Sequence, residues 1–132
     1  MMISALLAAA FLTGSGSAYA SCDGSTTQTA SGQTVQVGFV AANGLRMGSW
    51  VEMRSPRLVM NRRWFRVMDR GGMASGTDLD FWTDDCAWMN AFGRRTVTYR
   101  VVPRSELYRG RPYKGWRVVK GRRGARLQWR AR

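Results

Sequence analysis

The sequence contains no histidine, and this absence excludes much of the usual chemistry of enzyme sites. Histidine is the commonest general base, the usual activator of serine and cysteine nucleophiles, and a frequent zinc ligand. Ser-His and Cys-His catalysis and most zinc sites are therefore disfavoured, and we expect no cofactor and no metal. Any acid–base catalysis must use carboxylates, of which the chain has 8 among 132 residues.

Two of these few carboxylates have a sequence setting that suits chemistry. Asp69 follows an apolar strand and precedes Arg70 and Gly71, where backbone can approach a ligand closely. Asp80 lies between apolar neighbours, and partial burial beside a second carboxylate would raise its pKa as a general acid requires. The simpler alternative is that each aspartate is a turn or hydrogen-bonding residue.

The chain also has no apolar run long enough to span a membrane stably. A short apolar run over residues 5–12 is followed by small residues and by Ala18-Tyr19-Ala20, which fits a cleavage site. We therefore predict a secretory signal peptide over residues 1–20, the alternative being a first helix of the domain.

There are only two cysteines, Cys22 and Cys86, and both follow the predicted cleavage site. In an oxidising compartment such a pair favours a disulfide. Lipidation of Cys22, as in bacterial lipoproteins, is the alternative, but Tyr19 stands where such signals usually have leucine. The predicted location is secreted, periplasmic or associated with the cell wall.

Negative charge is scarcest in residues 103–132, which hold eleven of the 21 basic residues and only one acid. The whole chain has a net charge of +13. A basic tail of this kind favours polyanions such as phosphate-bearing wall polymers, acidic lipid headgroups or nucleic acid. The alternative is a tail that is only solvated and disordered.

Alternating apolar residues predict short strands rather than layered α/β structure. We expect strands over residues 35–41, 50–53, 64–68 and 96–102, the second and third forming an antiparallel pair. A tight turn is expected at residues 69–72, and a helix capped by Thr83 should run to about Phe92. The tail is expected to form a hairpin from residues 116–120 and 125–130. This pattern predicts a small all-β barrel with one short helix.

Several motifs, taken together and in order, resemble the three-aspartate (3D) domain of bacterial cell-wall proteins. They are Thr29-Ala30-Ser31-Gly32, Val40-Ala41-Ala42-Asn43, Asp69-Arg70-Gly71-Gly72, Gly76-Thr77-Asp78-Leu79-Asp80-Phe81-Trp82 and Phe92-Gly93-Arg94-Arg95-Thr96-Val97. The Asp69-Arg70-Gly71 triplet is also similar to the motif of rare lipoprotein A. The resemblance covers about residues 29–102.

The resemblance implies a six-stranded double-psi β-barrel over residues 21–102, followed by the basic tail. It implies a peptidoglycan-active secreted domain that cleaves glycan strands as a lytic transglycosylase does, with Asp69 as acid/base and Asp80 as a supporting charge. Candidate substrate-binding residues are Asn43, Arg70, Gly71 and Trp82. Related sequences also carry cysteines near the positions of Cys22 and Cys86, which favours the disulfide.

One departure from the family pattern leaves two functions open. Asn43 stands where the family has its first aspartate, and an amide cannot exchange a proton as a carboxylate can. The chain is therefore expected to be either a monomeric enzyme acting on peptidoglycan or a non-catalytic module that binds the wall. A nucleic-acid binder is a third interpretation, which rests on charge alone and is disfavoured.

Overall fold

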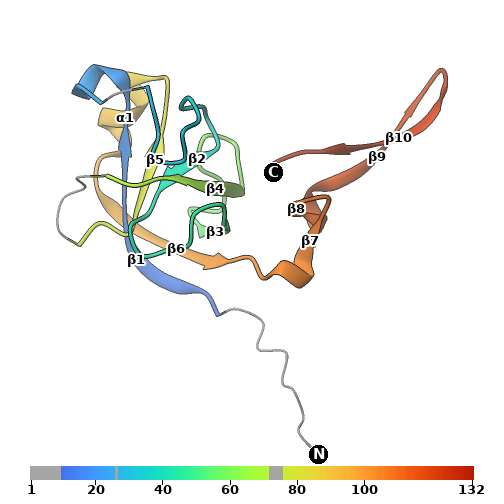
Figure 1. Cartoon of the computed structure of the whole chain (residues 1–132), viewed down its shortest axis with the longest axis horizontal. Helices are drawn as coiled ribbons and strands as arrows, with labels where there is room; N and C mark the ends of the chain where they lie inside the picture. The colour runs from blue at the N-terminus through green and yellow to red at the C-terminus, as the bar shows by residue number, and fades with distance from the viewer. Residues whose placement is uncertain (1–9, 26, 72–75) are drawn as a thin grey trace, which may run out of the picture.

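The computed structural model describes residues 10–25, 27–71 and 76–132. Six strands form a closed barrel, which lies on the left in Figure 1. The strands pair in the cyclic order β1-β5-β2-β4-β3-β6. Their bounds are β1 Leu12–Tyr19, β2 Phe39–Ala41, β3 Trp50–Ser55, β4 Trp64–Asp69, β5 Leu79–Trp82 and β6 Arg95–Val101. The prediction of an all-β chain with one short helix is confirmed.

The barrel mixes two strand directions. The pairs β1–β5 and β2–β4 are parallel, and the other four pairs are antiparallel, including the predicted pair β3–β4. Alternate residues of the strands point inward and are fully buried, as shown by Val51, Phe65, Phe81 and Val97. The rings of Phe65 and Phe81 meet edge to face with centroids 4.8 Å apart, which fills the centre of the barrel.

The first strand comes from the segment that was predicted to be a signal peptide. Residues 12–19 form β1, which pairs with β5 on one side and β6 on the other. The barrel therefore includes a strand that precedes residue 21, and the predicted domain boundary at that residue stays a prediction. Cleavage after Ala20 stays a prediction, but it would remove a strand that closes the barrel. Residues 1–9 of the predicted signal lie outside the described residues.

Two other elements differ in their limits from the prediction. The strand expected over residues 35–41 begins only at Phe39, because Gly38 adopts a φ of +106° and the Phe39 amide closes a turn onto the Gln36 carbonyl. The helix α1 spans Cys86–Phe92 and is capped by Asp85, whose carboxylate accepts from the Trp88 amide. Thr83, the predicted cap, instead accepts from the Asp85 amide. Gly72, in the predicted turn, lies outside the described residues.

The basic C-terminal region is an ordered arm, contrary to the alternative of a disordered tail. It contains β7 (Leu107–Tyr108), β8 (Arg111–Pro112) and the predicted hairpin of β9 (Trp116–Gly121) and β10 (Gly124–Trp129). The hairpin extends away from the barrel and the chain then returns toward it (Figure 1). There Trp129 packs on Trp50 and Trp64, and the Ala131 carbonyl accepts from the Trp64 amide.

The predicted disulfide is confirmed: Cys22 is bonded to Cys86 and so joins the end of β1 to the start of α1. This bond is consistent with an oxidising compartment. Within the described ranges, no helix has the length and apolar character needed to cross a membrane.

Candidate functional site

The two predicted aspartates lie on strands that flank β2. Ala41 of β2 pairs in register with Asp69 on one side and with Asp80 on the other. Asp80 in turn pairs with Ser17 of β1. Four adjacent strands therefore bring Ser17, Asp80 and Asp69 to one region of the barrel. The sequence had indicated the two aspartates as site residues but not Ser17.

Asp69 is buried and fully engaged in hydrogen bonds. One carboxylate oxygen, Oδ1, accepts from the amides of Ala30 and Arg70 at 2.8 and 2.9 Å, and Oδ2 accepts from the Tyr19 hydroxyl at 2.8 Å. Three donors on two oxygens suit an ionised carboxylate, which only accepts. Asp69 therefore supplies a fixed negative charge and holds the loops around it in place.

Asp80 has a different environment, and among the described residues one hydrogen bond reaches its carboxylate. The Ser17 hydroxyl donates to Oδ1 at 2.9 Å. Burial raises the pKa of Asp80 to about 6, with further upward contributions from the negative charges of Asp23 and Asp69, while the Ser17 hydrogen bond opposes the shift. A carboxyl with this pKa holds a proton in part of the population near neutrality, as a general acid must.

Tyr19 donates to Asp69 and is close enough to Asp80 to be affected by its charge. Its pKa is raised, first by burial and then by the hydrogen bond to Asp69 and the charges of Asp69 and Asp80. The phenol therefore stays protonated and donates to Asp69 across the physiological range. Ser17 and Tyr19 are adjacent outward positions of β1, so that one strand contacts both acids.

Asn43 has a structural partner in the loop that follows Asp69. Its amide nitrogen donates to the Gly71 carbonyl at 2.9 Å, and its oxygen accepts from the Gly71 amide at 3.1 Å. A carboxylate could not donate to a carbonyl, so asparagine suits this reciprocal contact better than an aspartate would. Arg70 strengthens the same junction because its guanidinium donates to the Ala42 carbonyl. The two predicted ligand residues Asn43 and Arg70 thus fix the loop, and Gly71 is exposed beside them.

Trp82, the remaining predicted ligand residue, is half-buried and pairs in register with Tyr19 on β1. Its position next to the acids leaves part of the indole accessible, as a sugar-binding surface requires. The predicted residues therefore lie around the two aspartates, and none was placed in a remote part of the barrel.

Sequence analysis missed Ser17 and Tyr19 because their segment was assigned to a signal peptide. The signal that could have found them is the alternation of Ser15, Ser17 and Tyr19 with Gly14, Gly16 and Ala18, which is the period of a strand. Asp78 was also overlooked. Its carboxylate accepts from the Ser15 amide at 2.8 Å and so fastens the start of β5 to β1.

The described residues around the two aspartates do not include a set of side chains that could hold a metal ion. Across residues 10–25, 27–71 and 76–132, no three side chains of the metal-binding types gather as ligands. The arrangement suits proton transfer by Asp80 beside a fixed negative charge.

Comparison of the sequence with protein-family models and with curated proteins gives no match.

Proposed function

We propose that the chain is a double-psi β-barrel of the three-aspartate type that acts on the glycan strands of peptidoglycan, with Asp80 as its acid/base. The observation that carries the proposal is the half-buried Asp80 carboxyl, whose pKa is raised to about 6 beside Asp69 and Tyr19. The closed six-stranded barrel and the motif order of the 3D domain support the same assignment.

One carboxyl is sufficient for the proposed reaction. Protonated Asp80 donates its proton to the glycosidic oxygen as the bond between that oxygen and the anomeric carbon breaks. The Asp80 carboxylate then accepts the proton of the sugar's own primary hydroxyl, whose oxygen bonds to the anomeric carbon and closes an anhydro ring. Water is not consumed, so no second carboxylate is needed to activate it, unlike in ordinary glycoside hydrolysis.

The proposal exchanges the roles that the sequence predicted for the two aspartates. Asp69 has three donors that stabilise its charged form, so we assign it the fixed charge that helps to raise the pKa of Asp80. That charge also favours the positive character that develops at the anomeric carbon. Asp80 has one weaker partner and takes the acid/base role.

The test is mass spectrometry of the products after incubation of the protein with purified peptidoglycan. We expect anhydro-sugar fragments from the wild type, none from Asp80→Asn, and wild-type yield from Asp84→Asn. Asp84 is a suitable control because it is an exposed aspartate that loses the same charge. The rate should fall as the pH rises above about 6, because Asp80 then loses its proton. Fragments that persist in Asp80→Asn would refute the catalytic assignment.

A second candidate function is a non-catalytic module that binds the wall, and Asn43 favours it. Its reciprocal bonds to Gly71 fill the family's first acidic position with a structural contact. In the same assay, this candidate predicts that the protein sediments with peptidoglycan but releases no fragments, and that Asp80→Asn sediments equally well.

A further inference from the structure

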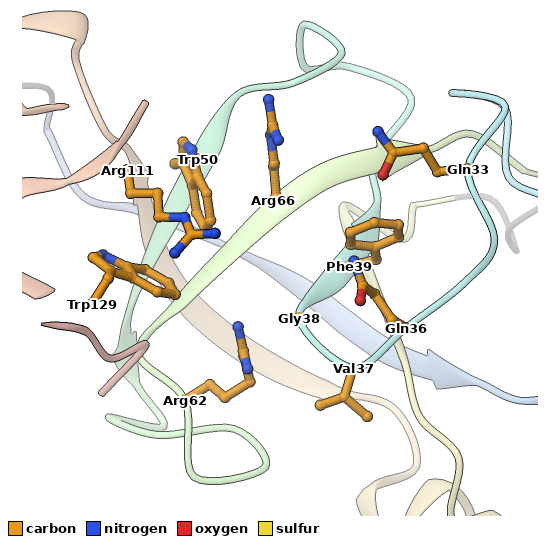
Figure 2. A pocket seen from close by; sticks show the side chains of 10 residues that line it. All are labelled: Gln33, Gln36, Val37, Gly38, Phe39, Trp50, Arg62, Arg66, Arg111 and Trp129. Carbon is orange, nitrogen blue, oxygen red and sulfur yellow. The ribbon is translucent and has the colours of Figure 1, made fainter. Parts of the chain in front are cut away.

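A cavity of about 270 Å³ is lined by residues of both the barrel and the C-terminal arm, and no aspartate is among them. Its wall includes three arginines from separate segments: Arg62 in the loop before β4, Arg66 in β4 and Arg111 in β8. Figure 2 shows these side chains around the hollow, with Trp50 and Trp129 along one wall. The barrel and the arm thus build the cavity together.

Within the part of the chain that the structure describes, no carboxylate forms an ion pair with these three arginines. The ion pairs of the described residues join Glu52 to Arg63 and Arg100, and Glu106 to Arg100. Among the described residues, the Arg62 Nε has no hydrogen-bond partner although it is buried, and burial lowers the pKa of this side chain. A buried N–H group without an acceptor is costly, and a bound anion would remove that cost.

Aromatic rings hold the guanidinium groups by their faces. Arg66 lies 5.7 Å from the Trp50 ring centroid, and Arg111 lies 5.3 Å from that of Trp129. Stacking of this kind positions a planar guanidinium while its N–H groups remain available at the edge. Stacking also occupies the indole faces, which disfavours nucleic acid, because bases bind to proteins largely by stacking on such faces.

The backbone beside the cavity is shaped for Arg62. Gly38 lines it with a φ of +106°, and a Cβ at this position would lie 2.6 Å from the Arg62 Nη2 atom. Any other residue would displace the guanidinium from the cavity wall. Glycine therefore permits both the turn and the close approach of Arg62.

A second cavity of about 290 Å³ shares Arg66 and Trp50 with the first and adds Arg46 and Arg104. The two cavities are therefore lined by five arginines, and Arg66 belongs to both. Positive charges spread over two adjoining cavities suit a chain that carries negative charges at intervals better than a single small anion.

We propose that these two cavities, together the arginine row, bind a linear polyol-phosphate chain through successive phosphate groups. The planar N–H fork of arginine matches phosphate oxygens in a bidentate manner. Each cavity is near the lower end of the range for small-ligand sites, which suits one phosphate with its neighbouring polyol and not a folded partner. Gln33 and Gln36 at the rim offer amides to hydroxyl groups.

The arginine row also lies within reach of the proposed glycan site. Arg66 precedes Asp69 by three residues on β4, a distance of about 10 Å along a strand. A phosphate-bearing polymer linked to the wall could therefore be held while the glycan lies at Asp80. Phosphate binding itself does not depend on whether the barrel cleaves glycan.

The test is isothermal titration calorimetry with poly(glycerol phosphate) and with glycerol phosphate as probes. Arg66→Gln combined with Arg111→Gln should weaken polymer binding about tenfold or more, as expected for the loss of charged hydrogen bonds. The matched control is Arg122→Gln with Arg126→Gln, which removes the same charge from exposed positions of the hairpin region and should change affinity less than threefold. Arg66→Lys should give an intermediate affinity, since lysine cannot bind in a bidentate manner.

The polymer should bind more tightly than glycerol phosphate, because its phosphates reach both cavities. Equal weakening in the two double variants would overturn the proposal, since binding would then follow net charge alone. Binding to phosphatidylglycerol vesicles or to single-stranded DNA but not to the polymer would also overturn it. Asp80→Asn should retain polymer binding, so a failure of the catalytic proposal is distinguishable from a failure of this one.

Discussion

The carboxyl groups of Asp69 and Asp80 illustrate how neighbouring residues of one type acquire different properties. Asp69 receives three hydrogen bonds, two of them from backbone amides, whereas Asp80 receives one from a serine hydroxyl. The free energy of burying the charge is therefore offset at Asp69 and only partly offset at Asp80. Asp80, which is less well stabilised as an anion, keeps its proton up to a higher pH than an ordinary aspartate, as a general acid near neutrality must.

This difference predicts that Asp80→Asn stabilises the fold at alkaline pH. The pKa of Asp80 is about 6 in the folded chain against 3.8 for an ordinary aspartate, so the folded state binds more protons between these values. The free energy of unfolding must then fall as the pH rises from about 4 to 6, and it stays lowered above that range. Asparagine has no charge and so removes the free-energy cost of burying an ionised carboxylate at this position. We expect a higher Tm than wild type at pH 8 and no advantage below pH 4, by thermal melts. An equal effect from Asp84→Asn would contradict the role of burial.

At the level of elements, the disulfide joins two segments that hold the site. Cys22 follows β1, which carries Ser17 and Tyr19, and Cys86 begins α1. Replacement of both cysteines by serine should lower the free energy of unfolding by about 4 kcal/mol, because the closed loop is long. Urea unfolding of the variant and the wild type measures the difference. An unchanged midpoint would show that the ends of β1 and α1 are held together by other contacts.

A second prediction at this level concerns β1. A chain that begins at Ser21 lacks β1, the strand that joins β5 to β6. It also lacks the Tyr19 hydroxyl, one of the three donors to Asp69. We expect this chain to lose the cooperative thermal transition that a chain beginning at Ala10 shows. Circular dichroism melts compare the two, and N-terminal sequencing of secreted protein reports whether cleavage after Ala20 occurs. A cooperative transition in the shorter chain would mean that the barrel closes without β1.

The elements also show how far the sequence predicts this fold. The strands β3, β4 and β6 were found because their alternating apolar residues fill the core. The strand β1 was missed because it is made largely of glycine, serine and alanine, which resemble a cleavage region. Close packing explains that composition: a Cβ on Gly16 would lie 2.7 Å from a methyl carbon of Val97 on β6. Such a requirement depends on a neighbour 81 positions away and leaves no local pattern.

The site was also predictable only in part, because some of its contacts join residues that are far apart in the sequence. Asp69 and Asp80 were identified from their settings and motifs, yet their roles depend on Tyr19 and Ser17, which pairing across strands brings to them. The reciprocal bonds of Asn43 with Gly71 likewise join positions 28 residues apart. Residue types are visible in a sequence, whereas the number of donors around a carboxylate appears only after folding.

For the whole molecule, the main question is how a strongly basic arm stays attached to a barrel. Eleven basic residues lie within positions 103–132, so mutual repulsion favours release of the arm into solvent. Apolar and backbone contacts oppose this. The Trp129 ring centroid lies 5.3 Å from that of Trp50 and 6.4 Å from that of Trp64, and the Trp50 indole donates to the Gly110 carbonyl of the arm at 2.9 Å. Trp129 therefore anchors the hairpin end of the arm, while the Arg100–Glu106 ion pair holds its beginning to β6.

Trp129→Ala should therefore release the arm while leaving the barrel folded. We expect a loss of about 2 kcal/mol, less than for a fully buried tryptophan, because Trp129 is partly exposed. Trypsin should cut the arm faster and tryptophan emission should shift to the red as Trp50 meets water. Val118→Ala is the control, since Val118 lies in the same hairpin and is 64% exposed. Trp129→Ala should also bind poly(glycerol phosphate) more weakly than the wild type, because Arg111 loses the Trp129 ring that positions it. Unchanged proteolysis would show that the backbone contacts at Ala131 suffice to hold the arm.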